Sequence, residues 1–153
     1  MSGQHSAFLP LAAMMFVAGL GIPMFASLNA GLGQQLHGAI AATAVSFGVG
    51  LVIALLVLAV TGSFPAAGHF TLDKPWLYFA AVFMLFYASA VAFSAPRIGL
   101  GNAIFFVLLG QLISAAVIDH FGFLGVIQSS LTAKRVIGLM VMALGLYLAR
   151  KPV

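Results

Sequence analysis

The chain has 153 residues and a net charge of +4, but only 5% of its residues are charged and 63% are hydrophobic. A soluble domain carries about a quarter charged residues to coat its surface, so this composition excludes an ordinary water-soluble globular domain. The length suits a single membrane domain, 1–153, rather than several domains. The basic residues occur singly or in pairs, and without a basic stripe the net positive charge does not indicate a nucleic-acid partner.

The first membrane helix is predicted over about 8–32. No Asp, Glu, Lys or Arg precedes Asp73, and a spanning helix needs about 20 mostly apolar residues. Pro23 lies inside this segment and is expected to kink it, which membrane helices tolerate when neighbours satisfy the freed carbonyl. Because no basic residue precedes the apolar run, we interpret it as a retained helix rather than a cleaved signal.

Three further stretches, 39–60, 76–96 and 98–118, are apolar, free of charge and long enough to span a bilayer. We expect Pro96 and Gly99 to separate the third helix from the fourth. A small residue recurs at every fourth position of the second stretch, at Ala42, Ser46, Gly50 and Ala54. Such a stripe lets another helix approach closely, either within the chain or across a dimer seam.

A fifth crossing is predicted over 132–150, although it is short. Only 14 uncharged residues separate Arg135 from Arg150, which corresponds to roughly 21 Å of helix. Counted from Thr132, a plausible N-cap, the helix reaches roughly 28 Å if its flanking cations extend toward the interface. We therefore favour five crossings over four, and an all-α membrane protein.

The basic residues show no preference for one side of the membrane. With five crossings, each side holds three of them: Lys74, Lys134 and Arg135 on one, and Arg97, Arg150 and Lys151 on the other. Because basic loops set orientation, a chain without bias is able to insert both ways and to pair as an antiparallel dimer. The alternative is that other determinants fix one orientation. Without the fifth crossing, both termini are expected in the cytoplasm.

Polar residues within the predicted helices are the first candidates for a functional site, since polar groups at membrane depth tend to face a cavity or a partner. Gln111 lies near the middle of the fourth helix and shares a face with Ser114. It is expected either to line a cavity or to bond neighbouring helices. Asn29 and Asn102 are further candidates for solute binding, with helix packing as the alternative.

Two charged residues at helix ends are candidates for gating. Asp119 ends the fourth helix, where a carboxylate opposes the helix dipole. Lys134 or Arg135 is expected to pair with it, and a proton- or cation-linked site is the alternative. Arg97, beside the third helix break, is expected to meet an anionic headgroup, an anionic substrate or Asp119 of an opposed subunit.

The motifs of enzymes and of cofactor binding are missing from the sequence. It has no cysteine and no His spacing typical of metal ligands. It also lacks a P-loop, an HExxH motif and a nucleophile–base pair. We therefore expect neither enzymatic activity nor a metal or cofactor. No carboxylate lies in the middle of a helix, which weakens an interpretation as a cation exchanger.

The chain resembles the YdcZ-like family, a branch of the drug/metabolite transporter superfamily. The resemblance rests on these segments: Leu28–Gly33, Ala44–Gly50, Ala95–Gly99, Gly110–Gln111, Ile118–Gly125 and Leu131–Gly138. It implies a five-helix half-unit of the bacterial inner membrane that pairs into a ten-helix antiparallel dimer, or with a related five-helix chain. It also raises Asn29, Arg97, Gln111 and Asp119 as site residues.

The leading hypothesis is a secondary transporter of a small solute, working by alternating access between two subunits. The alternative is a non-transporting subunit that scaffolds or stabilises a larger membrane complex. A passive channel is disfavoured because no ring of like charges or polar stripe follows any one helix.

Overall fold

The computed structural model describes residues 2–66 and 73–149, with the side chains of 8–66, 73–123 and 125–149. Every regular element in these ranges is a helix, as the composition predicts. The chain divides into two compact units, Met1–Pro96 and Arg97–Val153. Each unit is described by itself.

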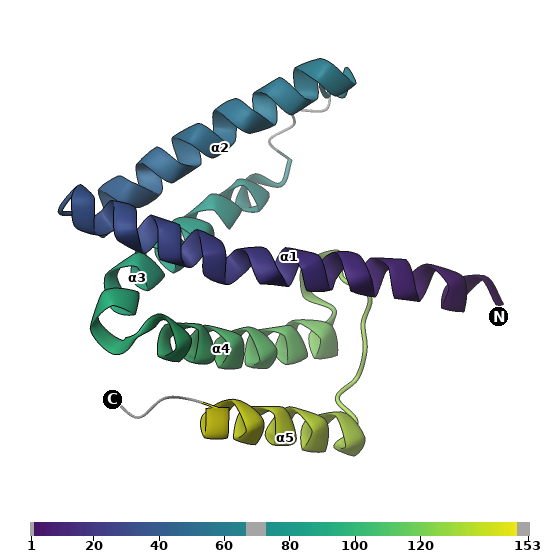
Figure 1. Ribbon diagram of the computed structural model, residues 1–153. Coiled ribbons are helices and arrows are strands. Elements are labelled where there is room, and N and C mark those ends of the chain that lie inside the picture. Colours follow the sequence, from purple (N-terminus) through teal and green to yellow (C-terminus); the bar gives the residue numbers. More distant parts are fainter. Residues whose placement is uncertain (1, 67–72, 150–153) are drawn as a thin grey trace. The chain divides into compact units, whose positions relative to one another are not determined.

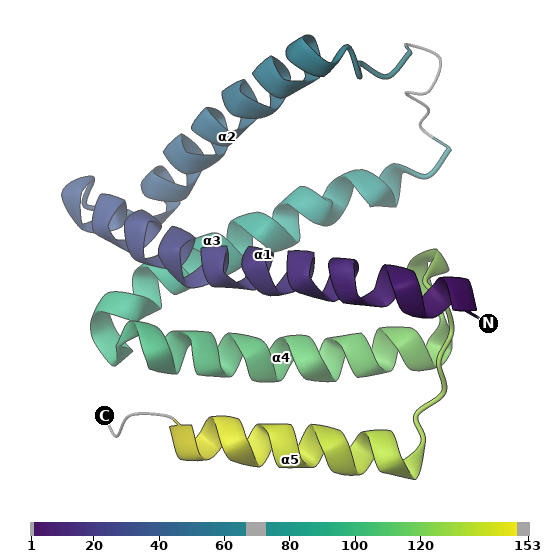
Figure 2. The same cartoon turned by 45° about the vertical axis from the view of Figure 1, so that its right-hand side comes forward.

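The first unit is built from three long helices. They are α1 (Ser2–Gln35), α2 (Ala39–Thr61) and α3 (Ala80–Ile98), with the short 3₁₀ helix η2 (Pro75–Phe79) before α3. Two α3 residues continue into the second unit. In Figures 1 and 2, α1 and α2 diverge from the tight turn that joins them.

The turn between α1 and α2 is closed by backbone hydrogen bonds. His37 adopts a left-handed conformation with φ 52°, and the N–H of Gly38 donates to the carbonyl oxygen of Gly33 at 3.0 Å. Gly33 also lies against the start of α2, where an added Cβ would lie 3.6 Å from the Cα of Ala39. The two helices therefore pack closely next to this turn.

The second unit contains α4 (Leu100–Phe121), the 3₁₀ helix η3 (Phe123–Gly125) and α5 (Ala133–Ala149). Figure 2 shows α4 and α5 side by side. The α5 residues of intermediate exposure lie at 135, 139, 143 and 146, which is one helical stripe. No α5 residue is buried, so this helix packs along one side only.

The break between α3 and α4 lies at Gly99 alone. The prediction that Pro96 also interrupts the chain is wrong, because α3 continues through Pro96 to Ile98. A proline in a membrane helix is tolerated when the freed carbonyl is satisfied elsewhere. At Gly99 the backbone has φ 85°, a conformation that no continuous right-handed helix contains.

Within the described ranges, four helical segments are long and apolar enough to cross a membrane: Phe8–Gln35, Ala39–Thr61, Pro75–Ile98 and Leu100–Phe121. The fifth helix, α5, has 17 residues, or about 25 Å of length, against a hydrocarbon core of about 30 Å. Its predicted N-cap is confirmed, because the backbone N–H of Arg135 donates to the Thr132 hydroxyl at 3.3 Å. Its crossing stays a prediction, and the end at Arg150 lies outside the described residues.

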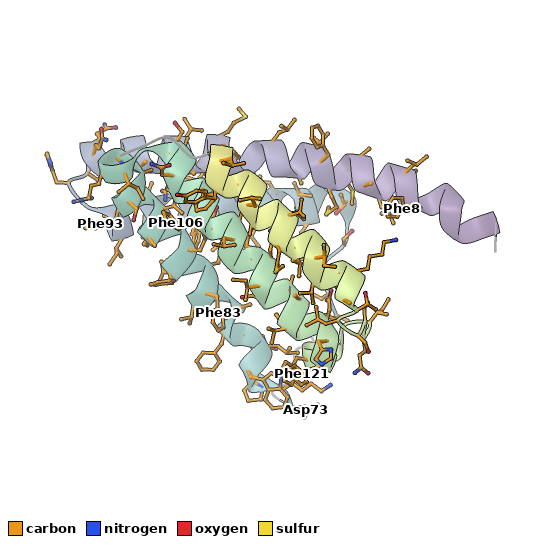
Figure 3. The ribbon with its side chains drawn as sticks, turned by 90° about the horizontal axis from the view of Figure 1, so that it is seen from below. Phe8, Asp73, Phe83, Phe93, Phe106 and Phe121 are labelled. Carbon is orange, nitrogen blue, oxygen red and sulfur yellow. The ribbon has the colours of Figure 1, made fainter. Side chains whose placement is uncertain are left out.

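Small side chains fill the interior of the first unit and large ones point outward. Ala26, Ala42 and Ala88 are 0–1% exposed, whereas Phe83 is 77% exposed and projects from the ribbon in Figure 3. In water this arrangement would be unfavourable. In a bilayer it is the normal one, because helices approach closely through small residues while bulky apolar side chains meet the lipid.

Candidate functional site

The most buried polar side chain of α1 is Asn29, which is 2% exposed. Its amide nitrogen donates to the Thr43 hydroxyl on α2 at 3.1 Å and to the Ala88 carbonyl on α3 at 3.3 Å. Its amide oxygen accepts from the Ser46 hydroxyl at 3.0 Å. We call these four groups the Asn29 node. It joins the three long helices of the first unit at one point.

The Asn29 node is almost fully satisfied. Both amide N–H groups of Asn29 are used, and the Thr43 hydroxyl donates to the Ala39 carbonyl at 2.9 Å. An amide oxygen has two lone pairs, so one acceptor position of Asn29 is left. Since unsatisfied polar groups in hydrocarbon cost several kcal/mol each, this arrangement lets a primary amide exist at membrane depth. Solute binding by Asn29 stays a prediction.

Sequence reasoning missed Thr43 as part of this node and considered Ser46 only as a small residue. The signal was present, because two hydroxyl residues three apart lie on one face of an otherwise apolar helix. The first half of the small-residue stripe packs within the chain: Ala42 is fully buried and Ser46 is half-buried. Gly50 and Ala54 are exposed, so that half of the stripe is open to lipid or to a partner.

Two hydroxyl groups of α3 are buried without a partner. The Tyr87 and Ser89 hydroxyls make no hydrogen bond within the described residues. They are two positions apart, or about 200° around the helix, so they point to different sides of α3. They therefore do not form one polar patch.

Asn102 lies in the first turn of α4 and is 6% exposed. Its amide nitrogen donates to the Ile98 carbonyl at 3.0 Å, and so bridges the helix break at Gly99. Its amide oxygen is buried and has no partner within the described residues. The geometry gives Asn102 a role in joining α3 to α4, and leaves one acceptor for another group.

Gln111 is the opposite case. It is exposed, lies inside the spanning segment Leu100–Phe121, and follows Asn102 by nine residues. Nine residues correspond to about 180° around a helix, so Asn102 and Gln111 lie on opposite faces of α4. One cavity on one side of α4 therefore cannot receive both side chains. Ser114, also exposed, shares the Gln111 face.

Asp119 is held by the segment that leads into α5. Its carboxylate forms an ion pair with the Arg135 guanidinium, which confirms one of the two partners expected from the sequence. The Asp119 carbonyl accepts from the N–H of Ser129 at 2.8 Å, and Arg135 also donates to the Ser129 carbonyl at 3.2 Å. The adverse effect of a carboxylate at a helix C-terminus is offset by this cation.

His120 completes the connection between α4 and α5. Its carbonyl accepts from the Gln128 side chain at 3.0 Å, and its ring Nδ1 accepts from the backbone N–H of Leu131 at 3.2 Å. We call this set the loop clasp, with these members: Asp119, His120, Gln128, Ser129, Leu131 and Arg135. Sequence reasoning named the two charged members, Asp119 and Arg135, but no pattern pointed to Gln128 or Ser129.

The remaining predicted residue, Arg97, is exposed in the last turn of α3, where a cation is favourable to the helix dipole. The candidate residues are thus divided. Asn29 belongs to the first unit, and Arg97, Asn102, Gln111 and Asp119 belong to the second. Within the described ranges no three His, Cys, Asp or Glu side chains gather in a group that could hold a metal ion.

A family model described as "Putative inner membrane exporter, YdcZ" matches residues 10–148, nearly the whole chain. The chain belongs to the YdcZ family. The family is described as one of inner-membrane exporters and not as an enzyme family, which supports a role in transport. With its long apolar helices, the protein is a multi-pass protein of the inner membrane. No curated protein and no solved structure matches the chain.

Proposed function

We propose that the protein is a secondary transporter that moves a small solute by alternating access, with two five-helix subunits enclosing a polar cavity. Membership of a family of exporters supports the general activity. One observation carries the finer proposal. Gln111 is an exposed primary amide with no hydrogen-bond partner among the described residues, on a helix that is otherwise suited to lipid.

An exposed amide at this depth needs donors and acceptors, because lipid offers none. A second subunit that covers the Gln111 face would convert it into the wall of a cavity, where a solute or water completes its hydrogen bonds. Ser114 lies on the same face and adds a hydroxyl. In this proposal Gln111 binds the solute, while Asn29 and Asn102 contribute mainly by joining helices.

Arg97 and Asp119 would act at the ends of the pathway. Both lie at helix ends, and Asp119 already has a cation partner in Arg135. We propose that the ion pair forms and breaks as the pathway opens on alternate sides. Asp119 would pair with Arg135 in one state and with Arg97 of an opposed subunit in the other. Its carboxylate would then have a cation partner in both states.

The balance of basic residues supports an antiparallel homodimer, or a pair with a related five-helix chain. With five crossings, one side of the membrane holds Lys74, Lys134 and Arg135, and the other holds Arg97, Arg150 and Lys151. The last two lie outside the described residues. A reporter fused to the C-terminus tests this arrangement. Signal from both compartments is expected; signal from one compartment contradicts the dual orientation.

Transport is tested in proteoliposomes with a panel of radiolabelled amino acids, monosaccharides and organic cations. At least one solute is expected to be taken up. Gln111→Ala is expected to lower the rate of uptake by tenfold or more, about the factor that follows when an uncharged hydrogen bond is removed from a buried site. Gln35→Ala is the matched control, because Gln35 is an exposed glutamine in the last turn of α1. Full uptake by Gln111→Ala would refute the assigned role.

The scaffold alternative makes a different prediction. A non-transporting subunit should co-purify with a larger membrane protein in fixed stoichiometry, whereas a transporter of this kind purifies as a dimer. In that case the exposed Gln111 face would be a packing contact with the partner. Mass spectrometry of the gently solubilised complex distinguishes the two.

A further inference from the structure

The His120 ring acts as a hydrogen-bond acceptor across the loop between α4 and α5. Nδ1 accepts from the backbone N–H of Leu131 at 3.2 Å, while the His120 carbonyl holds the Gln128 side chain at 3.0 Å. A ring nitrogen that accepts a hydrogen bond carries no proton, so the neutral ring must have its proton on Nε2. The contact therefore exists only while His120 is neutral.

We propose that His120 is a proton-operated latch that regulates the connection between α4 and α5. Protonation places a hydrogen on Nδ1, which then faces the N–H of Leu131, donor against donor. The segment before α5 loses one of its ties to α4. Histidine is the side chain that ordinarily changes charge between about pH 5 and 8, so the latch opens as the adjoining compartment becomes acidic.

The surroundings of His120 make it the group that responds. In the described part of the second unit, Asp119 and Arg135 belong to the loop clasp and form an ion pair with each other. Lys134 precedes Arg135 in the chain. The intervening segment, 122–132, contains no titratable side chain. The other ties of the loop clasp do not involve the His120 ring, so they stay intact when the ring gains a proton.

Neighbouring aromatic rings hold the imidazole in place. Phe121 meets the His120 ring edge to face, with centroids 4.8 Å apart, and stacks on Phe123 at 5.2 Å. These contacts do not depend on the proton on Nδ1. Protonation is therefore expected to release the Leu131 segment while the ring itself stays against Phe121.

The consequence for transport rests on the proposed function. In an antiparallel dimer the two copies of this loop face opposite compartments, so a pH difference across the membrane would open one latch and leave the other closed. The latch lies next to Asp119, which is assigned to gating. The direction of the proton gradient would thus decide which of the two subunits has its latch open.

The chain has no cysteine, so a single thiol reports on the loop. Ser130→Cys places it at an exposed position between Ser129, which stays tied to Asp119 and Arg135, and Leu131, which is released. A nitroxide attached there is followed by electron paramagnetic resonance in phosphatidylcholine vesicles. The mobile population is expected to rise about fivefold between pH 8 and pH 5, the factor that corresponds to one lost hydrogen bond.

Two substitutions and one control make the test specific. His120→Asn retains an acceptor near the Nδ1 position that gains no proton, so the loop is expected to stay immobile at both pH values. His120→Phe removes the acceptor, and the loop should be mobile at both. His37→Asn is the control, because Asn tolerates the left-handed backbone at His37 (φ 52°), and it should keep the full response.

Equal label mobility at pH 5 and pH 8, or a response that survives His120→Asn, would overturn the latch. A second measurement uses the unsubstituted histidine: ¹⁵N resonances of the ring at pH 8 should show Nε2–H and an unprotonated Nδ1, and the opposite tautomer contradicts the proposal. Neither measurement depends on solute flux. A protein that transports nothing but keeps the pH response refutes the proposed function and leaves the latch in place.

Discussion

Replacing Asn29 with alanine tests whether the Asn29 node holds the three helices of the first unit together. The substitution removes three interhelical hydrogen bonds, with Thr43 and Ser46 on α2 and with the Ala88 carbonyl on α3. The partners are not left orphaned, because Thr43 still donates to the Ala39 carbonyl and a serine hydroxyl in a helix is able to bond its own helix.

The expected loss follows from these contacts. Interhelical hydrogen bonds in membranes contribute on average about 0.6 kcal/mol each, so three amount to about 2 kcal/mol. Asn29 is 2% exposed, and the cavity left by truncation raises the total to about 2–3 kcal/mol. Ser46→Ala removes one bond and is expected to cost about 0.6 kcal/mol.

The free energy of unfolding is measured in mixed micelles with increasing sodium dodecyl sulfate. Thr61→Ala is the matched control, since the Thr61 hydroxyl is exposed and bonds only its own helix, to the Val57 carbonyl at 2.8 Å; its effect should stay within about 0.5 kcal/mol. If the free energy of unfolding of Asn29→Ala differs from that of the unsubstituted protein by no more than this margin, the node does not join the helices and the reasoning fails.

The other predictions concern the second unit and its caps. Asp119→Asn and Arg135→Gln, combined in a double-mutant cycle, should show a coupling of about 0.5–1 kcal/mol, as expected for a half-exposed pair that shares a network; zero coupling contradicts the ion pair. Gly122→Ala should destabilise by about 1–2 kcal/mol, because φ is 63° and the new methyl would lie 3.3 Å from the Gln128 Cβ. Gly62→Ala is the comparison, because Gly62 has φ 64° and open space around it, so only backbone strain of about 1 kcal/mol is expected. An equal loss of unfolding free energy at Gly62 and Gly122 would exclude a contribution from the Gln128 contact. Thr132→Ala should cost about 1 kcal/mol through the lost N-cap of α5, measured as the change in unfolding free energy, and an unchanged value would show that the cap is not used.

Local patterns account for the helices and for several of their ends. The spans can be predicted because the length of an apolar segment is counted from consecutive residues, and the thickness of the bilayer sets the length that is needed. Gly99 and Thr132 were identified for the same reason, since a glycine with positive φ and a threonine cap act within one turn. Pro96 was misjudged because proline only weakens a membrane helix, and the outcome depends on what satisfies the freed carbonyl.

The opposite placement of Asn102 and Gln111 was also available from their nine-residue spacing. Naming both residues as candidates for solute binding did not make use of that angle. Exposure in the structure then separates them, with Asn102 buried at the helix junction and Gln111 exposed. Spacing alone does not say which of the two faces is covered.

By itself, the sequence determined that this is an all-helical membrane protein of the YdcZ family, with four secure spans and few polar groups within them. Only the tertiary structure decided the partners of those groups: Asn29 with Thr43 and Ser46, and Asp119 with Arg135 rather than Lys134. Hydropathy is a property of each segment, whereas a partner is selected by the rotation and approach of two helices. That geometry arises from packing between distant segments, and no local pattern contains it.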